Sequence, residues 1–292
     1  MVAQTRPGGG AAPTVLRMVL GKRLRDLRRK AGLSFEEAAR ALDVTHATIR
    51  RIEKAEVGLK IPYVEKLLHT YGLTDPAEVE AFLVLARQAN RPGWWHRFRD
   101  VLPDWFSVFV SLESEASLIR AYEPHYVPGL LQTEDYTRAV LRAGMPSATD
   151  QEIERGVALR MERQQILYRG EDAPLLWVVV DETVFRRTIG GRDVMRRQVQ
   201  RLREATALPN VRLQIMPFSA GPHPAMYGPF HLFRFPLREL PDIAYSESLV
   251  GAVYFDQRDD VAAFLEALDR MCAQAAPTQR TEAILDGICK EI

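Results

Sequence analysis

Two short helical segments separated by a tight turn occupy residues 33–53, and no other feature constrains the N-terminal fold as strongly. Ser34 can cap the first segment, and Glu37 stands three residues later in the pattern of a capping box. Thr45 can cap the second segment, and Ile49 lies on its apolar side. We expect the two helices to meet at a fixed angle, with the first turn of the second helix facing outward.

The flanking segments are also helical in pattern, and none shows the alternation typical of a strand. Apolar residues recur at helical spacing over 15–30, Pro62 opens a further helix, and another is expected over 75–90. Residues 15–74 therefore predict an all-α domain of four or five short helices. Residues 1–14 are rich in Gly, Ala and Pro and lack the apolar core of a signal peptide, so we expect a disordered tail there.

Charge is distributed unevenly along the chain, although 39 basic and 38 acidic side chains nearly balance. Residues 1–74 hold 14 basic and 7 acidic side chains, whereas residues 75–292 hold 25 and 31. Such an asymmetry is typical of a nucleic-acid-facing module joined to a different domain. The alternative interpretation is a small helical bundle with a solvated basic face.

The outward turn of the second helix carries side chains suited to B-DNA, whose major groove admits an α-helix. Hydroxyl groups and free backbone N–H groups at a helix start suit phosphate oxygens. Arg51 is long enough to fork onto guanine, a contact worth about 1–3 kcal/mol of discrimination when bidentate. The residues expected to bind DNA are Thr45, His46, Ala47, Thr48, Arg50, Arg51, Lys54, Arg28 and Ser34.

Residues 15–73 resemble the Cro/cI-type (XRE-like) helix-turn-helix family, and the stretch Ile49-Arg50-Arg51-Ile52-Glu53 belongs to the match. In that family the second helix of the pair is the recognition helix, which enters the major groove. The resemblance implies base contacts from His46 and Arg51 and phosphate contacts from Thr45 and Thr48.

The same resemblance implies an internal salt bridge between Arg28 and Glu53 behind the recognition helix. Two residues depart from the family pattern. Phe35 stands where a polar phosphate contact is usual, and Ala55 replaces a glycine. The first departure weakens one expected backbone contact, and the second makes the end of the recognition helix less certain.

Residues 75–105 predict a helix and a Trp-rich connector, and residues 106–292 mix helical and strand patterns. Leu175–Val180 is a continuous apolar run, typical of a central strand covered on both faces. Leu112–Tyr122 is expected to be helical. Further strands are expected at 211–215, 230–235, 243–248 and 253–255. The fold class is therefore an all-α N-terminal helix-turn-helix domain followed by an α+β C-terminal domain with a central mixed sheet.

The C-terminal sequence resembles the domain of unknown function that follows the helix-turn-helix in actinobacterial WhiJ-like regulators. The matching segments are Trp94-Trp95, Leu112–Ala116, Tyr126–Thr133 with Tyr136, Val180–Glu182 and Met216–Phe218. The resemblance implies a regulator of development or antibiotic production, often encoded beside a small partner protein. It supplies no chemistry for this domain.

Polar residues of the C-terminal domain are candidates for binding a ligand or partner. They are Glu182 after the apolar strand, His223 and Tyr227 in the Gly/Pro-rich loop 219–229, and Glu247. No nucleophile elbow, P-loop, dinucleotide fingerprint or HExxH motif is present, and two cysteines allow no four-thiolate metal site. We expect no enzyme activity, no catalytic residue, no metal site and no cofactor.

These patterns predict a sequence-specific transcription regulator that binds double-stranded DNA as a homodimer, because one small helical head buries little surface. The C-terminal domain would supply dimerisation and a partner or effector surface. The alternatives are an antitoxin-like protein that binds a small partner and autoregulates through DNA, and a DNA-associated hydrolase. The longest apolar run is too short to span a bilayer, so we expect a cytoplasmic, nucleoid-associated protein.

Overall fold

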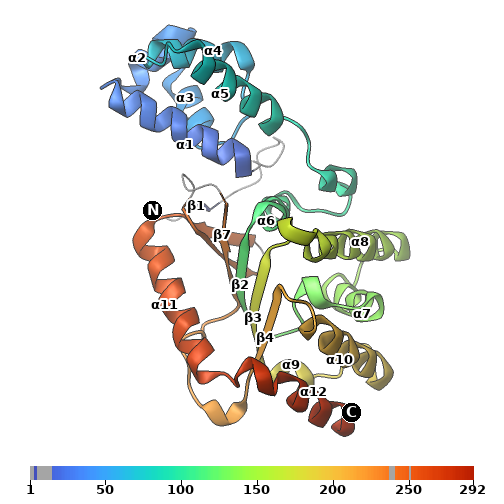
Figure 1. Ribbon diagram of the computed structural model, residues 1–292. Coiled ribbons are helices and arrows are strands. Elements are labelled where there is room, and N and C mark those ends of the chain that lie inside the picture. Colours follow the sequence, from blue (N-terminus) through green and yellow to red (C-terminus); the bar gives the residue numbers. More distant parts are fainter. Residues whose placement is uncertain (1–2, 5–14, 237–240, 250) are drawn as a thin grey trace. The chain divides into compact units, whose positions relative to one another are not determined.

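The computed structural model describes residues 3–4, 15–236, 241–249 and 251–292, and these residues form two compact units (Figure 1). The helical unit contains residues 15–99 and 103–115. The α+β unit contains residues 3–4, 100–102 and the described residues from 116 onward. Of the tail predicted at residues 1–14, only Ala3–Gln4 is described, and the rest lies outside the described residues.

The helical unit contains every helix predicted over residues 15–90, which confirms the all-α N-terminal fold. Residues 106–115, expected from the sequence to begin the α+β domain, group with this unit. Its helices are α1 (Val15–Lys30), α2 (Phe35–Leu42), α3 (His46–Glu53), α4 (Ile61–Thr70), α5 (Pro76–Ala89), the 3-10 helix η1 (Trp94–Phe98) and α6 (Asp104–Glu115).

The predicted caps begin the two central helices. Ser34 Oγ accepts a hydrogen bond from Glu37 N at 3.2 Å, and the Glu37 carboxylate accepts one from Ser34 N at 2.8 Å, which completes the capping box. Thr45 Oγ1 accepts from Thr48 N at 3.4 Å at the start of α3. After α3, Ala55 has a φ of 60°, a left-handed conformation that favours glycine and costs about 1 kcal/mol in other residues.

The apolar core of the helical unit joins α1 to α3. Leu20, Leu24 and Ile49 are fully buried in it. Gly21 faces the C-terminal end of α3, where a Cβ atom would lie 2.7 Å from the carbonyl oxygen of Glu53. Because real Cβ atoms do not approach backbone oxygens this closely, α1 and α3 pack at a separation that only glycine permits.

The aromatic side chains of the Trp-rich segment pack within the helical unit. The Trp94 and Trp95 rings meet edge to face with centroids 5.9 Å apart, and Trp95 and Phe98 are buried. Trp94 Nε1 donates to the hydroxyl of Ser114 on α6 at 3.2 Å. The segment after α5 is therefore a packed connection and not an exposed tether.

The α+β unit is built on one mixed sheet with the strand order β1-β7-β6-β5-β2-β3-β4. β2, β3 and β4 run parallel, whereas β5, β6 and β7 pair antiparallel with their neighbours. This confirms the predicted mixed sheet. The apolar strand β3 is paired on both sides, with β2 and β4, but it lies next to the edge strand β4 and not at the centre of the sheet. The strands are β1 (Ala3–Gln4), β2 (Leu118–Glu123), β3 (Leu175–Asp181), β4 (Val211–Met216), β5 (Phe230–Arg234), β6 (Ile243–Ser248) and β7 (Gly251–Phe255).

The prediction of a helix over Leu112–Tyr122 was wrong in its second half. The helix ends at Glu115, and β2 begins at Leu118. β2 is paired on both sides, with β3 and with β5. Short apolar runs are ambiguous between helix and strand, and here pairing with distant strands decides.

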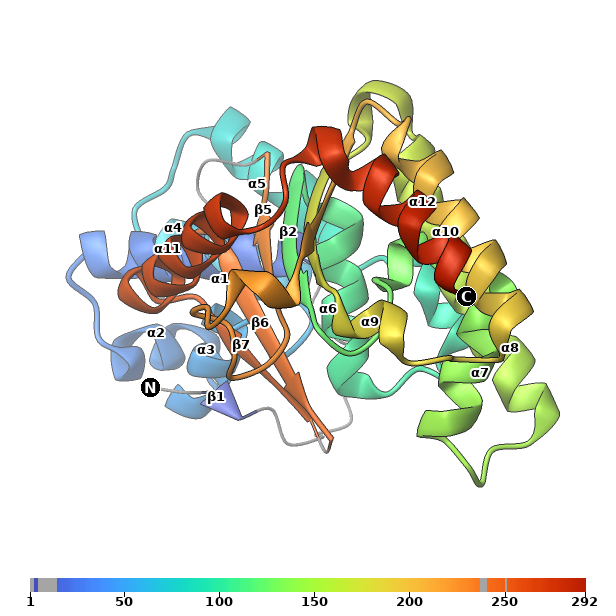
Figure 2. The same ribbon diagram turned by 90° about the horizontal axis from the view of Figure 1, so that it is seen from below.

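Helices cover both faces of the sheet in this unit. Figure 1 and Figure 2 show α11 on one side and α7, α8 and α10 on the other. Tyr122 belongs to the cluster formed with α11, so Glu123, the next residue of β2, faces the opposite side. The helices are η2 (Gly129–Leu131), α7 (Glu134–Gly144), α8 (Asp150–Arg163), η3 (Gln164–Tyr168), η4 (Gly170–Asp172), α9 (Thr183–Arg186), α10 (Arg192–Thr206), η5 (Phe218–Ala220), α11 (Arg258–Gln274), η6 (Thr278–Arg280) and α12 (Thr281–Glu291).

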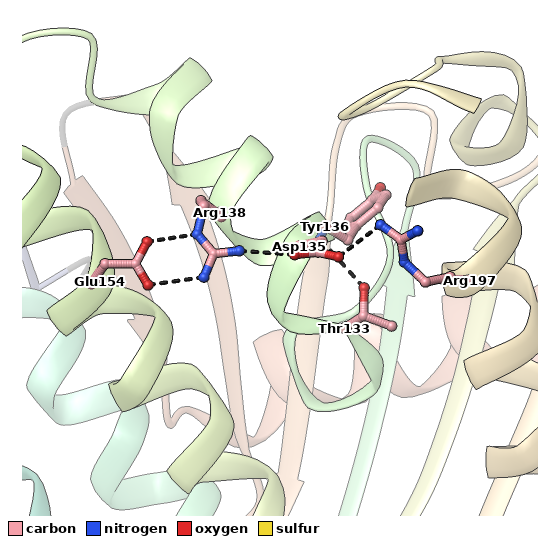
Figure 3. A network of polar contacts seen from close by, with 6 residues as sticks. All are labelled: Thr133, Asp135, Tyr136, Arg138, Glu154 and Arg197. Atoms are coloured by element: carbon pink, nitrogen blue, oxygen red, sulfur yellow. Dashed lines mark hydrogen bonds and ion pairs between the residues drawn. The ribbon is translucent and has the colours of Figure 1, made fainter. Parts of the chain in front are cut away.

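A network of ion pairs joins α7, α8 and α10 (Figure 3). Arg138 on α7 pairs with Glu154 on α8 at 2.6 Å and with Asp135 at 2.9 Å. Asp135 also accepts from Arg197 on α10 at 2.7 Å. A single surface pair contributes little, but linked pairs of this kind fix the register of neighbouring helices.

Buried polar groups gather where β2 ends. Glu123 is only 4% exposed, and His231 Nε2 lies 3.4 Å from its carboxylate. Burial and the nearby Glu247 raise the pKa of Glu123 well above its usual value, while Arg160 and Arg163 oppose the rise. Burial also lowers the pKa of His231 to about 3, so this imidazole is neutral.

No helix in the described part of the chain is both long enough and apolar enough to cross a membrane.

We expect Gly21→Ala to lower the free energy of unfolding of the helical unit by about 1–3 kcal/mol, because the added methyl group forces α1 away from α3. Urea denaturation followed by circular dichroism measures the change. Gly287→Ala on α12 is the control, since a Cβ there meets nothing within 4 Å. Equal stability of both variants and the wild type would contradict the close approach.

We expect Glu123→Gln to flatten the pH dependence of stability. The folded protein holds the Glu123 proton to a higher pH than the unfolded chain does, so the free energy of unfolding falls as pH rises above about 4.3. Glutamine does not ionise, so the variant loses less stability from pH 5 to 8 in denaturation titrations. Glu266→Gln, on the exposed side of α11, should retain the wild-type slope. A wild-type slope in Glu123→Gln would contradict the raised pKa.

Candidate nucleic-acid interface

The exposed face of α3 carries most of the residues expected to bind DNA. Ile49, Ile52 and Glu53 are buried against the rest of the helical unit. The opposite side of the helix is solvent-exposed, and Thr48 is half-buried at its edge. The exposed candidates are Thr45, His46, Ala47, Arg50, Arg51 and Lys54.

The N-terminal turn of α3 is suited to an anion. It contains no acidic residue, so the positive end of the helix dipole is not neutralised within the turn. The hydroxyl oxygens of Thr45 and Thr48 lie 3.1 Å apart, and Thr45 caps the Thr48 N–H. The remaining N–H groups of the first turn are of the kind that bind phosphate oxygens.

Arg51 has a weak partner on the protein itself. Its Nε lies 3.9 Å from the Glu56 carboxylate, and both side chains are largely exposed. Exposed ion pairs of this kind contribute at most about 1 kcal/mol. The guanidinium of Arg51 can therefore leave Glu56 for a base edge at small cost.

Arg28 lies inside the helical unit and not on the exposed face of α3. It is 6% exposed, and its Nε and Nη2 donate to the two Glu53 oxygens at 2.6 and 2.9 Å. Its Nη1 donates to the Leu33 carbonyl oxygen at 2.8 Å. The hydrogen bond to Glu53 raises the pKa of Arg28, so the guanidinium stays charged. The structure thus places Arg28 in the scaffold behind the recognition helix, where the resemblance puts a salt bridge.

Ser34 lies at the surface, at the start of α2. Its hydroxyl donates to Glu37 at 2.8 Å while it accepts from the backbone of the same residue. The hydrogen bonds that the Ser34 backbone N–H and hydroxyl donate to the Glu37 carboxylate lower the pKa of this carboxyl. Ser34 is thus engaged in its own helix cap, and only its exposure keeps it among the candidates for DNA contact.

The candidate residues of the α+β unit do not form one site. Glu182 pairs with Arg186 at 2.6 Å and accepts from Phe218 N at 3.0 Å. Tyr227 is fully exposed in its loop. Glu247 accepts hydrogen bonds from the hydroxyls of Tyr126 and Tyr245 at 3.0 and 2.6 Å, beside the buried Glu123.

His223 lies near the carboxyl end of β3, and its side chain is 8% exposed. Its Nε2 lies 3.2 Å from the hydroxyl oxygen of Tyr122, which donates to Asp181 at 3.1 Å. Its Nδ1 has no hydrogen-bond partner among the described residues. Sequence reasoning missed Tyr122 and Glu123 as members of polar clusters because it expected this segment to be helical. The Tyr-Glu pair that ends the Leu118–Glu123 strand is the signal that could have indicated them.

Within the described ranges, no group of three or more His, Cys, Asp and Glu side chains is placed to hold a metal ion. Both carboxylate oxygens of Glu182 have protein partners, and so does Nε2 of His223. The exposed face of α3 is therefore the surface whose chemistry indicates a binding partner.

Comparisons with known proteins match both parts of the chain. A model described as a helix-turn-helix domain matches residues 19–82. The HTH-type transcriptional regulator PuuR of Escherichia coli (strain K12) is 43% identical over 54 residues, which cover 18% of this chain and 29% of the relative. PuuR of Shigella flexneri matches to the same extent. The chain thus spans less than a third of the length of these relatives, and the similarity supports DNA-binding regulation for the shared domain.

The larger, C-terminal part of the chain matches a second family model. No solved structure matches the chain. A model described as a domain of unknown function (DUF5753) matches residues 106–287, which is more than half of the chain. The chain therefore belongs to the family defined by the domain of unknown function DUF5753, and it carries a helix-turn-helix domain before it.

Proposed function

We propose that the protein is a sequence-specific transcriptional regulator that binds double-stranded DNA through α3. The main observation that supports this proposal is the exposed face of α3, where Arg50, Arg51 and Lys54 follow an N-terminal turn without acidic residues. The helix enters the major groove, Arg51 and His46 contact base edges, and Thr45 and Thr48 contact phosphates. Its place of action is the cytoplasm, at the nucleoid, and the function requires neither a catalytic residue nor a cofactor.

The proposal includes a homodimer. A single helix-turn-helix head buries too little surface for specific affinity, and paired heads read two half-sites about 34 Å apart. The DUF5753 domain provides the dimer contact and the binding surface for a partner or effector, in the manner of the WhiJ-like regulators that the sequence resembles.

A second candidate function is that of an antitoxin-like protein, which binds a small partner and regulates its own synthesis through DNA. It is favoured by three large apolar side chains exposed near the loop after β4, at Phe218, Met226 and Tyr227. Exposed apolar groups that gather in one segment are typical of protein-binding surfaces. This candidate uses the same DNA interface and differs in what the α+β unit binds.

We expect Arg51→Ala to relax base preference, with a loss of about 1–3 kcal/mol on the preferred duplex and a smaller loss on unrelated DNA. Thr45→Ala should weaken binding to all duplexes alike, because a phosphate contact carries no sequence information. Gel shifts with a duplex selected from a random library, compared with the unselected pool, measure both effects. Thr45→Ser retains the hydroxyl and serves as the control. The absence of salt-sensitive, sequence-dependent binding by the wild type would refute the proposed function.

We expect the protein to sediment as a dimer at micromolar concentration and to protect two half-sites separated by about one helical turn, roughly 34 Å. Analytical ultracentrifugation and hydroxyl-radical footprinting on the selected duplex measure these quantities. A monomer that protects a single half-site would contradict the dimer while leaving DNA binding intact.

A further inference from the structure

Phe35, the first residue of α2, brings two arginines together. Its half-buried ring packs against the apolar core of the helical unit. The Cζ atom of Arg28 lies over this ring at 4.0 Å from the centroid, and that of Arg50 lies over it at 5.3 Å. Both distances are within the range of a cation–π interaction. One aromatic side chain therefore links α1, α2 and the recognition helix.

The two arginines differ in what neutralises them. Arg28 is buried and forms two hydrogen bonds with the carboxylate of Glu53. Arg50 is exposed, and no acidic side chain in the described part of the chain pairs with it. The ring thus orients Arg50 without cancelling its charge. An anion from outside the chain would complete this contact.

The position of Arg50 on α3 indicates which anion. Arg50 lies on one flank of the exposed side of α3, whereas Ala47 and Arg51, four residues apart, share its centre. Contact with Phe35 draws the guanidinium of Arg50 from that centre toward α2. When a helix lies in the major groove, base edges face the centre of its exposed side and the phosphates lie along its flanks.

The chemistry of the arginine side chain fits this placement. A guanidinium can stack on an aromatic ring through its flat face and still donate from its edge. Phosphate oxygens accept such donors in a bidentate fork. Because the ring already restrains a long, flexible side chain, less conformational freedom is lost when the phosphate binds.

We propose that Phe35 is a positioning residue that holds Arg50 for contact with a phosphate of the DNA backbone. The inference rests on the proposed DNA-binding function and adds a residue that does not itself touch DNA. Phe35 acts through Arg50, so its effect on binding should disappear when Arg50 is absent.

Salt dependence of DNA binding tests the inference. The probes are a duplex selected by the full-length wild-type protein from a random library and the unselected pool. Arg50→Ala should reduce the slope of log affinity against log salt concentration by about one, and it should weaken binding to both probes to a similar extent, roughly tenfold. Phe35→Leu, which retains apolar bulk without a ring face, should reproduce part of both losses. Phe35→Trp should retain the wild-type slope.

The double variant Phe35→Leu/Arg50→Ala should bind no more weakly than Arg50→Ala alone. Arg23→Ala is the matched control, because Arg23 is exposed on α1 and lies over Phe82 at 5.6 Å, away from α3. It removes the same charge and the same kind of cation–π contact as Arg50→Ala, but at a distance from the recognition helix. Its effect on the salt slope should therefore be much smaller. Thermal unfolding checks that each variant is folded, and Phe35→Met replaces Phe35→Leu if the latter does not fold.

Any of three outcomes overturns the inference while DNA binding stands. One is a wild-type slope and affinity in Phe35→Leu, and another is additive loss in the double variant. Equal effects of Arg23→Ala and Arg50→Ala would also overturn it, since they would indicate diffuse charge and not a placed contact. If the wild type shows no salt-dependent binding to DNA at all, the proposed function fails together with this inference.

Discussion

The position of the recognition helix depends on the buried ion pair between Arg28 and Glu53. The pair ties α1 to the last turn of α3 through two hydrogen bonds, at a point where Gly21 lets the two helices approach. Removing one partner of such a pair leaves an uncompensated buried charge, at a cost of about 3–5 kcal/mol. Because α3 is anchored from behind, its exposed side chains keep a defined orientation relative to α2.

A comparable constraint organises the α+β unit around β2. This strand separates the parallel from the antiparallel half of the sheet. Arg120 faces α11, where it pairs with Asp269 at 2.8 Å, and Glu123 faces the other side near His231. Burial of charged groups is unfavourable unless partners are supplied, so β2 specifies which elements cover each face.

Interactions between residues close together in the sequence could be predicted, whereas interactions between distant residues could not. Ser34 and Thr45 were recognisable as caps because each bonds to a backbone group three residues away. β2 was missed because its pairing joins residues far apart in the sequence, 57 positions for β3 and 108 to 116 positions for β5. The polar cluster around Glu123 was missed with it.

The amino-acid sequence by itself determined the helix-turn-helix, its caps and the residues of α3 that face outward, since local hydrogen bonds and helical periodicity set all three. Only the tertiary structure decided that Arg28 is buried against Glu53 and that Phe35 holds Arg50. It also gave the candidate residues Glu182, His223 and Glu247 different partners within the α+β unit. These contacts join different helices and strands, so they depend on tertiary packing. Local sequence patterns do not predict such packing.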